Sequence, residues 1–128
     1  MTVPALALST ESPATISADV LVLGVRKTDD GPRLLADAPE LEWLQDALGS
    51  IGVTGAEDQL RRIPGSEIAA ASIALIGLGS GDVTTNVLRY AAGSAGRQLR
   101  GIESIAFALP TKSDEDALAV LEGAALGA

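Results

Sequence analysis

Residues 72–101, SIALIGLGSGDVTTNVLRYAAGSAGRQLRG, decide the fold of this chain. The stretch opens with an aliphatic run of the kind found in strands that are covered on both faces. Alternating glycines follow at 77–81, and a helical pattern begins at Asp82. Many nucleotide-binding units begin with a strand, a glycine turn and a helix in this order. The stretch therefore raises the question of whether this chain binds a nucleotide.

The second half of the stretch predicts the best-defined helix of the chain. Asp82, Thr84 or Thr85 can cap its N-terminus, because short polar side chains accept hydrogen bonds from the first free amides. Gly101 fits the C′ position after its last turn. The apolar side chains that share one face are Val87, Ala91, Ala95 and Leu99, and Leu88 and Ala92 widen this face.

Working outward, the remaining patterns predict four further strands and two further helices. The strands are expected at residues 3–9, 18–25, 57–65 and 102–110, and the helices at 39–49 and 113–128. The segment 18–25 is a second buried-type strand, and the polar segment 26–33 after it predicts a turn. The segment 57–65 fits a strand at the margin of the sheet. Strand, helix and strand over residues 72–110 predict a right-handed βαβ unit.

Both flanking helices carry recognisable ends and apolar faces. The helix at 39–49 has Pro39 in its first turn and can close at Gly49. Its apolar face is formed by Leu41, Leu44 and Leu48, with Trp43 beside them. The helix at 113–128 has Ser113 as its N-cap and acids in its first turn. Its apolar positions are Leu118, Leu121 and Leu126, which predict an amphipathic helix.

The composition narrows the class of protein. The chain has 128 residues, a length typical of one domain, and contains no cysteine and no histidine. Disulfides, thiol nucleophiles and imidazole ligands are therefore excluded. A net charge of −8 and only three aromatic residues argue against nucleic-acid binding by this piece. There is neither a membrane-length apolar run nor a signal-peptide pattern, so we expect a soluble, cytoplasmic α/β domain.

The glycine segment 77–81 departs from the known phosphate-binding patterns. In G-x-G-x-x-G the third glycine comes one residue later, where this chain has Asp82. That carboxylate would compete with a pyrophosphate for the helix amides. Glu103 has the separation expected of a ribose-binding acid but lies at the start of its strand, and the lysine of a P-loop is missing. We favour a tight turn in which glycine allows a positive φ. Phosphate binding stays open, because strand C-termini do host ligands.

The other polar clusters allow both a structural and a functional interpretation. The acids of residues 113–117 fit a solvated helix start or a metal site, and Asp29-Asp30 fit a turn or a metal site. Arg61-Arg62 fit a solvated strand face, or a contact with an anion or a partner subunit. Asp19 fits a turn cap and a ligand contact equally. No arrangement of a nucleophile with a base is present. We therefore assign no catalytic, cofactor-binding or metal-ligating residue in this chain.

Several stretches together resemble the N-terminal domain of leucyl (cytosol) aminopeptidases, the M17 metallopeptidase family. The matching stretches are ADVLVLGV at 18–25, IALIGLGSGD at 73–82, LRYAAGSAGRQLRG at 88–101, IAFALP at 105–110 and ALAVLEGAALGA at 117–128. The resemblance covers nearly the whole chain, from about residue 5. It implies a mixed α/β sheet flanked by helices, a three-layer sandwich similar to the macro domain.

The resemblance also implies that the chemistry lies elsewhere. Residues 1–128 would form a single non-catalytic domain, and the family signature N-T-D-A-E-G-R appears nowhere in them. The two divalent metals, manganese or zinc, would belong to a C-terminal catalytic domain that this chain does not contain. The parent would remove N-terminal residues from peptides, and this piece would serve folding and assembly of a hexamer. The last helix lacks a stop signal of its own, as expected of a piece of a longer chain.

Two other hypotheses remain at this point. The macro-like fold leaves open a free-standing module that binds ADP-ribose or a related nucleotide near residues 77–81. A purely structural subunit is the third possibility. Calorimetry with ADP-ribose separates the binding module from the other two hypotheses.

Overall fold

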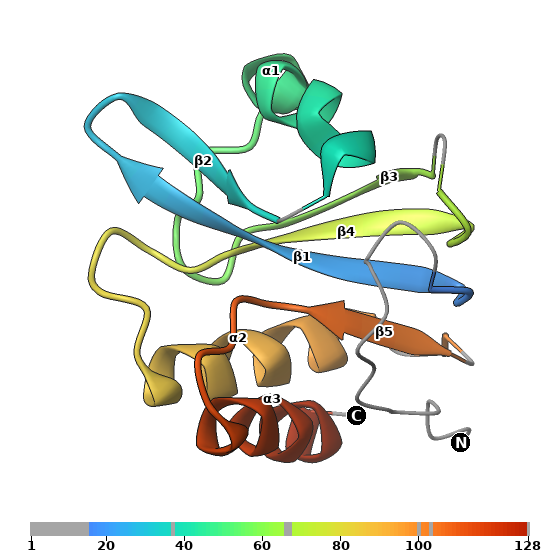
Figure 1. Ribbon diagram of the computed structural model, residues 1–128, viewed down its shortest axis with the longest axis vertical. Helices are drawn as coiled ribbons and strands as arrows, with labels where there is room; N and C mark the ends of the chain where they lie inside the picture. The colour runs from blue at the N-terminus through green and yellow to red at the C-terminus, as the bar shows by residue number, and fades with distance from the viewer. Residues whose placement is uncertain (1–15, 37, 66–67, 100, 103, 128) are drawn as a thin grey trace.

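A five-stranded mixed sheet forms the centre of the computed structural model, which describes residues 16–36, 38–65, 68–99, 101–102 and 104–127 (Figure 1). The strands are β1 (Val20–Thr28), β2 (Gly31–Leu35), β3 (Leu60–Pro64), β4 (Ser72–Gly77) and β5 (Ile105–Ala108). The helices are the 3-10 turn η1 (Pro39–Leu41), α1 (Glu42–Ile51), α2 (Thr85–Gln98) and α3 (Asp114–Gly127). The strand predicted at 3–9 lies outside the described residues.

Strand β1 is the centre of the sheet. It pairs in parallel with β4 along one side, and β3 joins β4 as an antiparallel strand at the margin. On its other side, the first half of β1 pairs in parallel with β5, and the second half pairs antiparallel with β2. The parallel strands β4 and β5 are joined through α2, as the βαβ pattern predicts. They are not neighbours, however, because β1 lies between them.

The sheet separates two hydrophobic cores, and the alternation along β1 explains why. Leu21, Leu23 and Val25 point to the core that α1 covers, whereas Val20 and Val22 point to the core that α2 and α3 cover. The result is a helix–sheet–helix sandwich, with α1 on one side of the sheet and α2 and α3 on the other (Figure 1). The predicted mixed sheet flanked by helices is confirmed. In the described part of the chain, no helix is both long and apolar enough to cross a membrane.

The polar segment after β1 is more than the turn predicted from the sequence. β1 continues through Thr28, Asp29-Asp30 form a tight turn, and β2 begins at Gly31, whose φ is +111°. The Thr28 hydroxyl donates to the Gly31 carbonyl at 2.6 Å and closes the turn. The sequence does not predict β2, because its five residues are half-buried or exposed and do not alternate between apolar and polar side chains.

One predicted helix end is shifted in the structure, and another is confirmed. Gly49 does not close α1. The helix continues to Ile51, and Gly52 (φ +89°) ends it by donating to the Leu48 carbonyl at 3.2 Å. Of the three candidate caps for α2, the structure selects Thr84, whose hydroxyl accepts from the backbone N–H of Val87 at 3.2 Å.

The C-terminal end of α2 is also shifted by one position. The helix ends at Gln98 with Leu99 as its C-cap, so Gly101 lies one residue beyond the predicted C′ position. Its φ of +84° is nonetheless the left-handed conformation for which glycine is suited.

The predicted apolar face of α3 is wrong. Leu118 and Leu126 are 56% and 83% exposed, and Leu121 is only half-buried. The residues that α3 buries are Asp116, Ala119, Val120, Gly123 and Ala124. The reason is close packing on α2, because a Cβ on Gly123 would lie only 2.1 Å from the carbonyl oxygen of Arg89. Small side chains are required at such a contact, and the leucines are left on the outer side of the helix.

Candidate functional site

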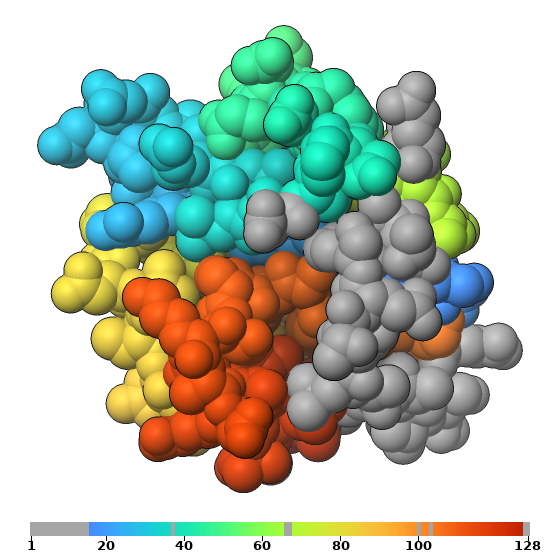
Figure 2. Space-filling view, in the orientation of Figure 1, coloured from blue at the N-terminus to red at the C-terminus, as the bar shows by residue number. Residues whose placement is uncertain are grey.

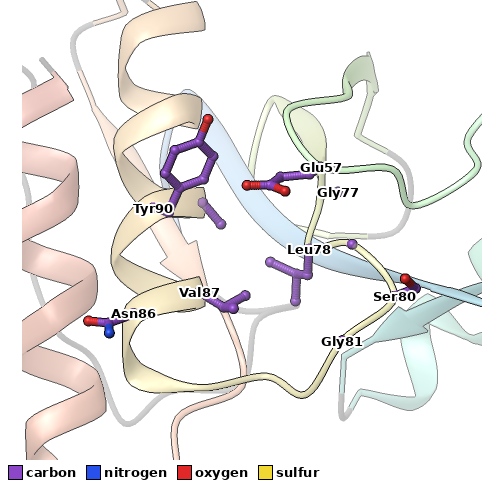
Figure 3. Close-up of a pocket in the computed structure, with 10 residues that line it drawn as sticks. Glu57, Gly77, Leu78, Ser80, Gly81, Asn86, Val87 and Tyr90 are labelled. Atoms are coloured by element: carbon purple, nitrogen blue, oxygen red, sulfur yellow. The ribbon is translucent and has the colours of Figure 1, made fainter.

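The glycine segment 77–81 lines a pocket of about 490 Å³ between the end of β4 and the start of α2 (Figure 3). The remaining lining residues are Glu57, Asn86, Val87, Tyr90 and Ala91. The carboxylate of Glu57 points across the pocket towards α2, where Tyr90 stands (Figure 3). Because open α/β sheets bind ligands beyond the carboxyl ends of their strands, this pocket is the candidate site.

Three of the five backbone amides of the glycine segment, those of Gly77, Leu78 and Gly79, are hydrogen-bonded within the protein. The N–H of Gly77 donates to the carbonyl of Gln59 at 2.8 Å. The N–H of Leu78 donates to Val25 at 2.8 Å, and the N–H of Gly79 donates to Gly55 at 2.9 Å. A phosphate-binding loop requires amides that are free to point at the phosphate oxygens. These three amides are therefore not free to bind an anion.

The glycines of the segment serve packing and backbone conformation. Gly79 has a φ of +81°, which confirms the predicted turn with positive φ at this position. A Cβ on Gly77 would lie 1.8 Å from the carbonyl oxygen of Ala56, so only glycine fits there. At Gly81 a Cβ would meet nothing within 4 Å. Two of the three glycines are thus explained without a ligand.

Glu57 and Asp58 form an acidic pair beside the pocket, and Asp58 is hydrogen-bonded to α2. The Tyr90 hydroxyl donates to Oδ2 of Asp58 at 2.7 Å, and the Gln98 side-chain amide donates to the Asp58 carbonyl at 3.0 Å. The Tyr90 hydrogen bond is the main cause that lowers the pKa of Asp58, with Ser94 and Arg97 adding to it against partial burial. The same bond raises the pKa of Tyr90.

This chemistry disfavours a phosphate ligand in the pocket. Asp58 stays ionised because its pKa is lowered. Glu57 brings a second carboxylate to the pocket lining, and the exposed Asp82 follows the glycine segment. A pyrophosphate entering the pocket would meet the carboxylate of Glu57 in the lining, with two more acids close by in the sequence. The site suits neither the fingerprint nor the ADP-ribose hypothesis.

The N-termini of α2 and α3 meet at a carboxylate that belongs to the protein itself. Oδ1 of Asp116 accepts from the Thr85 hydroxyl at 2.6 Å, and Oδ2 accepts from the backbone N–H of Lys112 at 3.0 Å. These two bonds, the Thr85 hydroxyl first, lower the pKa of Asp116. The Ser113 hydroxyl accepts from the Asp116 N–H at 3.2 Å, as predicted for an N-cap. Asp116 thus ties the first turn of α2 to the segment that precedes α3.

The prediction of a solvated acidic first turn in α3 is wrong for Asp116. Asp114 and Glu115 are exposed, as expected of a solvated first turn, but Asp116 is buried, with 8% of its surface exposed. Within the described residues, no group of three or more carboxylates lies close enough to hold a metal ion.

The remaining candidate residues lie in a turn, on a marginal strand and at the start of β1. Asp29-Asp30 form the predicted turn between β1 and β2. Arg61-Arg62 are exposed on the marginal strand β3, where Arg62 Nε donates to the Ser72 hydroxyl at 3.1 Å. Asp19 and Ser104 exchange two hydrogen bonds, of 2.9 and 3.1 Å, that join the start of β1 to the start of β5. Asp19 therefore lies at the opposite end of β1 from the pocket. Glu103 lies outside the described residues.

The sequence did not predict the two hydrogen-bonded side-chain pairs, Tyr90 with Asp58 and Thr85 with Asp116. Tyr90 and Asp58 are 32 residues apart, and Thr85 and Asp116 are 31 residues apart. No spacing rule for helices or strands links positions at such separations. The weak signal was that Tyr90, the single tyrosine of the chain, falls outside the apolar face predicted for its helix.

Fold and site together define an α/β sandwich domain in which Thr84 and Ser113 cap the N-termini of α2 and α3. Residues 20–128 match the family described as the cytosol aminopeptidase family, N-terminal domain, and the chain belongs to this family. It is 49% identical over 99% of its length to a probable cytosol aminopeptidase of Clavibacter michiganensis subsp. michiganensis, and 43% identical over 100% to one of Leifsonia xyli subsp. xyli. The chain spans 25% of the length of these relatives.

A comparison with solved structures gives the same fold. The bottromycin maturation enzyme BotP matches with a TM-score of 0.60 and 23% identity, over 87% of this chain and 23% of its own. A structure of BotP in complex with Mn matches equally well. The resemblance inferred from the sequence is confirmed by the family match and by the relatives.

Proposed function

We propose that this chain is the non-catalytic part of a cytosol aminopeptidase that removes N-terminal amino acids from peptides. The observation that carries the proposal is the match of residues 20–128 to the N-terminal domain of that family, combined with relatives that are about four times longer. The relatives are named as aminopeptidases, and most of their length lies outside the region that this chain matches.

In this proposal, the peptide and two divalent metals, manganese or zinc, bind in the part of the parent that lies beyond this chain. A two-metal site assists the attack of water on the scissile carbonyl. Support comes from the chemistry available here, because the chain has no histidine or cysteine and its buried carboxylate Asp116 is already hydrogen-bonded to Thr85 and Lys112. The chain would contribute folding and the assembly of a hexamer, and the relatives' name supports a cytosolic location.

The test compares the 128-residue chain with the full-length parent, each incubated with a leucine arylamide and Mn²⁺ or Zn²⁺. We expect turnover by the parent that stops on metal chelation, and none by the chain alone. Turnover by the chain above the blank would overturn the non-catalytic role. A parent without aminopeptidase activity would overturn the proposed reaction. Light scattering of the parent tests the hexamer separately.

No observation favours a second function. The pocket beside the glycine segment 77–81 would be the place for ADP-ribose, but the amides of Gly77, Leu78 and Gly79 are bonded within the protein, and Glu57 brings a negative charge to the lining.

A further inference from the structure

The helix α3 lies at the surface of the molecule (Figure 2), and its outer side carries apolar side chains that we call the leucine face and define as Leu118, Leu121, Ala125 and Leu126. Leu118 is 56% exposed and Leu126 is 83% exposed. Among the described residues, the other large exposed hydrophobic side chains are Trp43 on α1 and Tyr90 at the pocket, at 37% and 45%. Single apolar side chains on a surface need no explanation, but several on the same side of one helix suit an interaction site.

The spacing of the leucine face is that of a helix-packing seam. Residues 118, 121 and 125 follow one another at intervals of three and four, so they lie along one side of α3. Seams with this spacing pack against apolar faces of other helices. Glu122 is exposed between Leu118 and Leu126, which favours a basic side chain on whatever covers the leucine face.

α3 cannot turn to bury these leucines within the described domain. Its inner side is held against α2 through Gly123, where even a methyl group would collide with the carbonyl of Arg89. Rotation of α3 would bring the leucines onto this backbone contact, where there is no room for them. The leucine face is therefore a fixed feature of the domain surface, and its cover must come from outside the described residues.

We propose that the leucine face is covered by the segment that follows residue 128 in the full-length protein, through an apolar helical face. The chain matches an N-terminal domain and spans a quarter of its relatives, so most of a full-length protein follows this domain. α3 is the last element of the described chain, and its most exposed leucine, Leu126, lies in its last turn. A segment tethered there reaches the face at a high effective concentration, which a second copy of the chain does not. The inference rests on family membership and is independent of the proposed peptidase activity.

The test is photo-crosslinking in the full-length protein, with Leu126→p-benzoylphenylalanine as the probe and Trp43→p-benzoylphenylalanine as the control. We expect a crosslink within one chain from position 126 to residues beyond 128, identified by peptide mass, and a yield several-fold above the control at the Trp43 position. Crosslinks that join two chains, crosslinks that end within residues 1–128, or a yield no higher than the control would each overturn the proposal.

A second measurement follows hydrogen exchange in the full-length protein. The double variant Leu118→Gln and Leu126→Gln changes only exposed side chains, so the domain itself stays folded. We expect at least tenfold faster exchange in the crosslinked segment beyond residue 128, and no change with the matched control Trp43→Gln. Equal exchange in the double variant and the wild type would show that the leucine face covers nothing.

Discussion

Replacing Gly123 by alanine tests the close contact between α3 and α2. The added Cβ would lie 2.1 Å from the carbonyl oxygen of Arg89, whereas real Cβ atoms essentially never approach within 3.0 Å. This neighbour is a backbone atom, so no side chain can swing away to make room. α3 must instead move outward by close to 1 Å, and a gap of about 0.5–1 Å loses a quarter to a half of the dispersion energy of the atoms it separates.

The expected magnitude follows from two opposing effects. Overpacking of this kind costs about 1–3 kcal/mol, and a backbone obstacle places it at the upper end. Alanine in place of a mid-helix glycine contributes about 1 kcal/mol in the opposite direction. We therefore expect Gly123→Ala to lower the free energy of unfolding by about 1–2 kcal/mol. The melting temperature should fall by roughly 4–8 °C, measured by circular dichroism of the 128-residue chain.

Gly49→Ala is the matched control, because Gly49 also lies inside a helix but a Cβ there would meet nothing within 4 Å. The helix propensity then acts alone, and the variant should gain about 0.5–1 kcal/mol. If Gly123→Ala melted at or above the wild-type temperature while Gly49→Ala behaved as expected, the backbone contact between Gly123 and Arg89 would be refuted.

Three further predictions concern the pocket and the helix N-termini. Gly77→Ala should destabilise the chain by about 2 kcal/mol or more, because its Cβ would lie 1.8 Å from the Ala56 carbonyl oxygen. Gly81→Ala should stay within about 0.5 kcal/mol of wild type, because its Cβ would meet nothing within 4 Å. Urea unfolding measures both variants, and equal losses of stability would contradict the packing role of Gly77. Because the pKa of Asp116 is lowered in the folded protein, its carboxylate stabilises the fold above the ordinary carboxyl pKa of about 4, and this stability is lost as the pH falls. Thr85→Val should therefore lower the urea midpoint most near neutral pH and less in acid. A difference in midpoint that does not depend on pH would count against a role of the carboxylate. Titration calorimetry with ADP-ribose should give no heat at millimolar ligand, and micromolar binding would reverse our interpretation of the glycine segment 77–81.

Elements that bury both faces were predictable from the sequence, because burial leaves continuous aliphatic runs. β1 and β4 were located in this way, and the spacing of Leu41, Leu44 and Leu48 located α1. The family resemblance rested on the same segments. The hairpin strand β2 was missed because it lies at the margin of the sheet, where burial places few constraints on residue type.

The wrong face of α3 has a different physical cause. Hydropathy ranks Leu118 and Leu126 above Ala119 and Gly123, so the sequence pattern predicted the leucines as the apolar face of α3. The partner surface is a helix that approaches at backbone distance, and there side-chain size decides which face fits. Likewise, the bonds of Thr85 to Asp116 and of Tyr90 to Asp58 join distant segments, so they depend on a tertiary arrangement that no local pattern contains.

The backbone of Asp58 has a consequence for how the domain opens. Its φ of +67° is unusual for a residue other than glycine and costs about 1–3 kcal/mol unless its surroundings hold it. The groups that hold it, the Tyr90 hydroxyl and the Gln98 amide, both belong to α2. When α2 frays, Asp58 loses both of these bonds, and the loop before β3 keeps its backbone bonds to Gly77 and Gly79. The backbone of Asp58 should therefore relax together with α2, whereas the marginal strand β3 opens separately, with amide-exchange rates of its own.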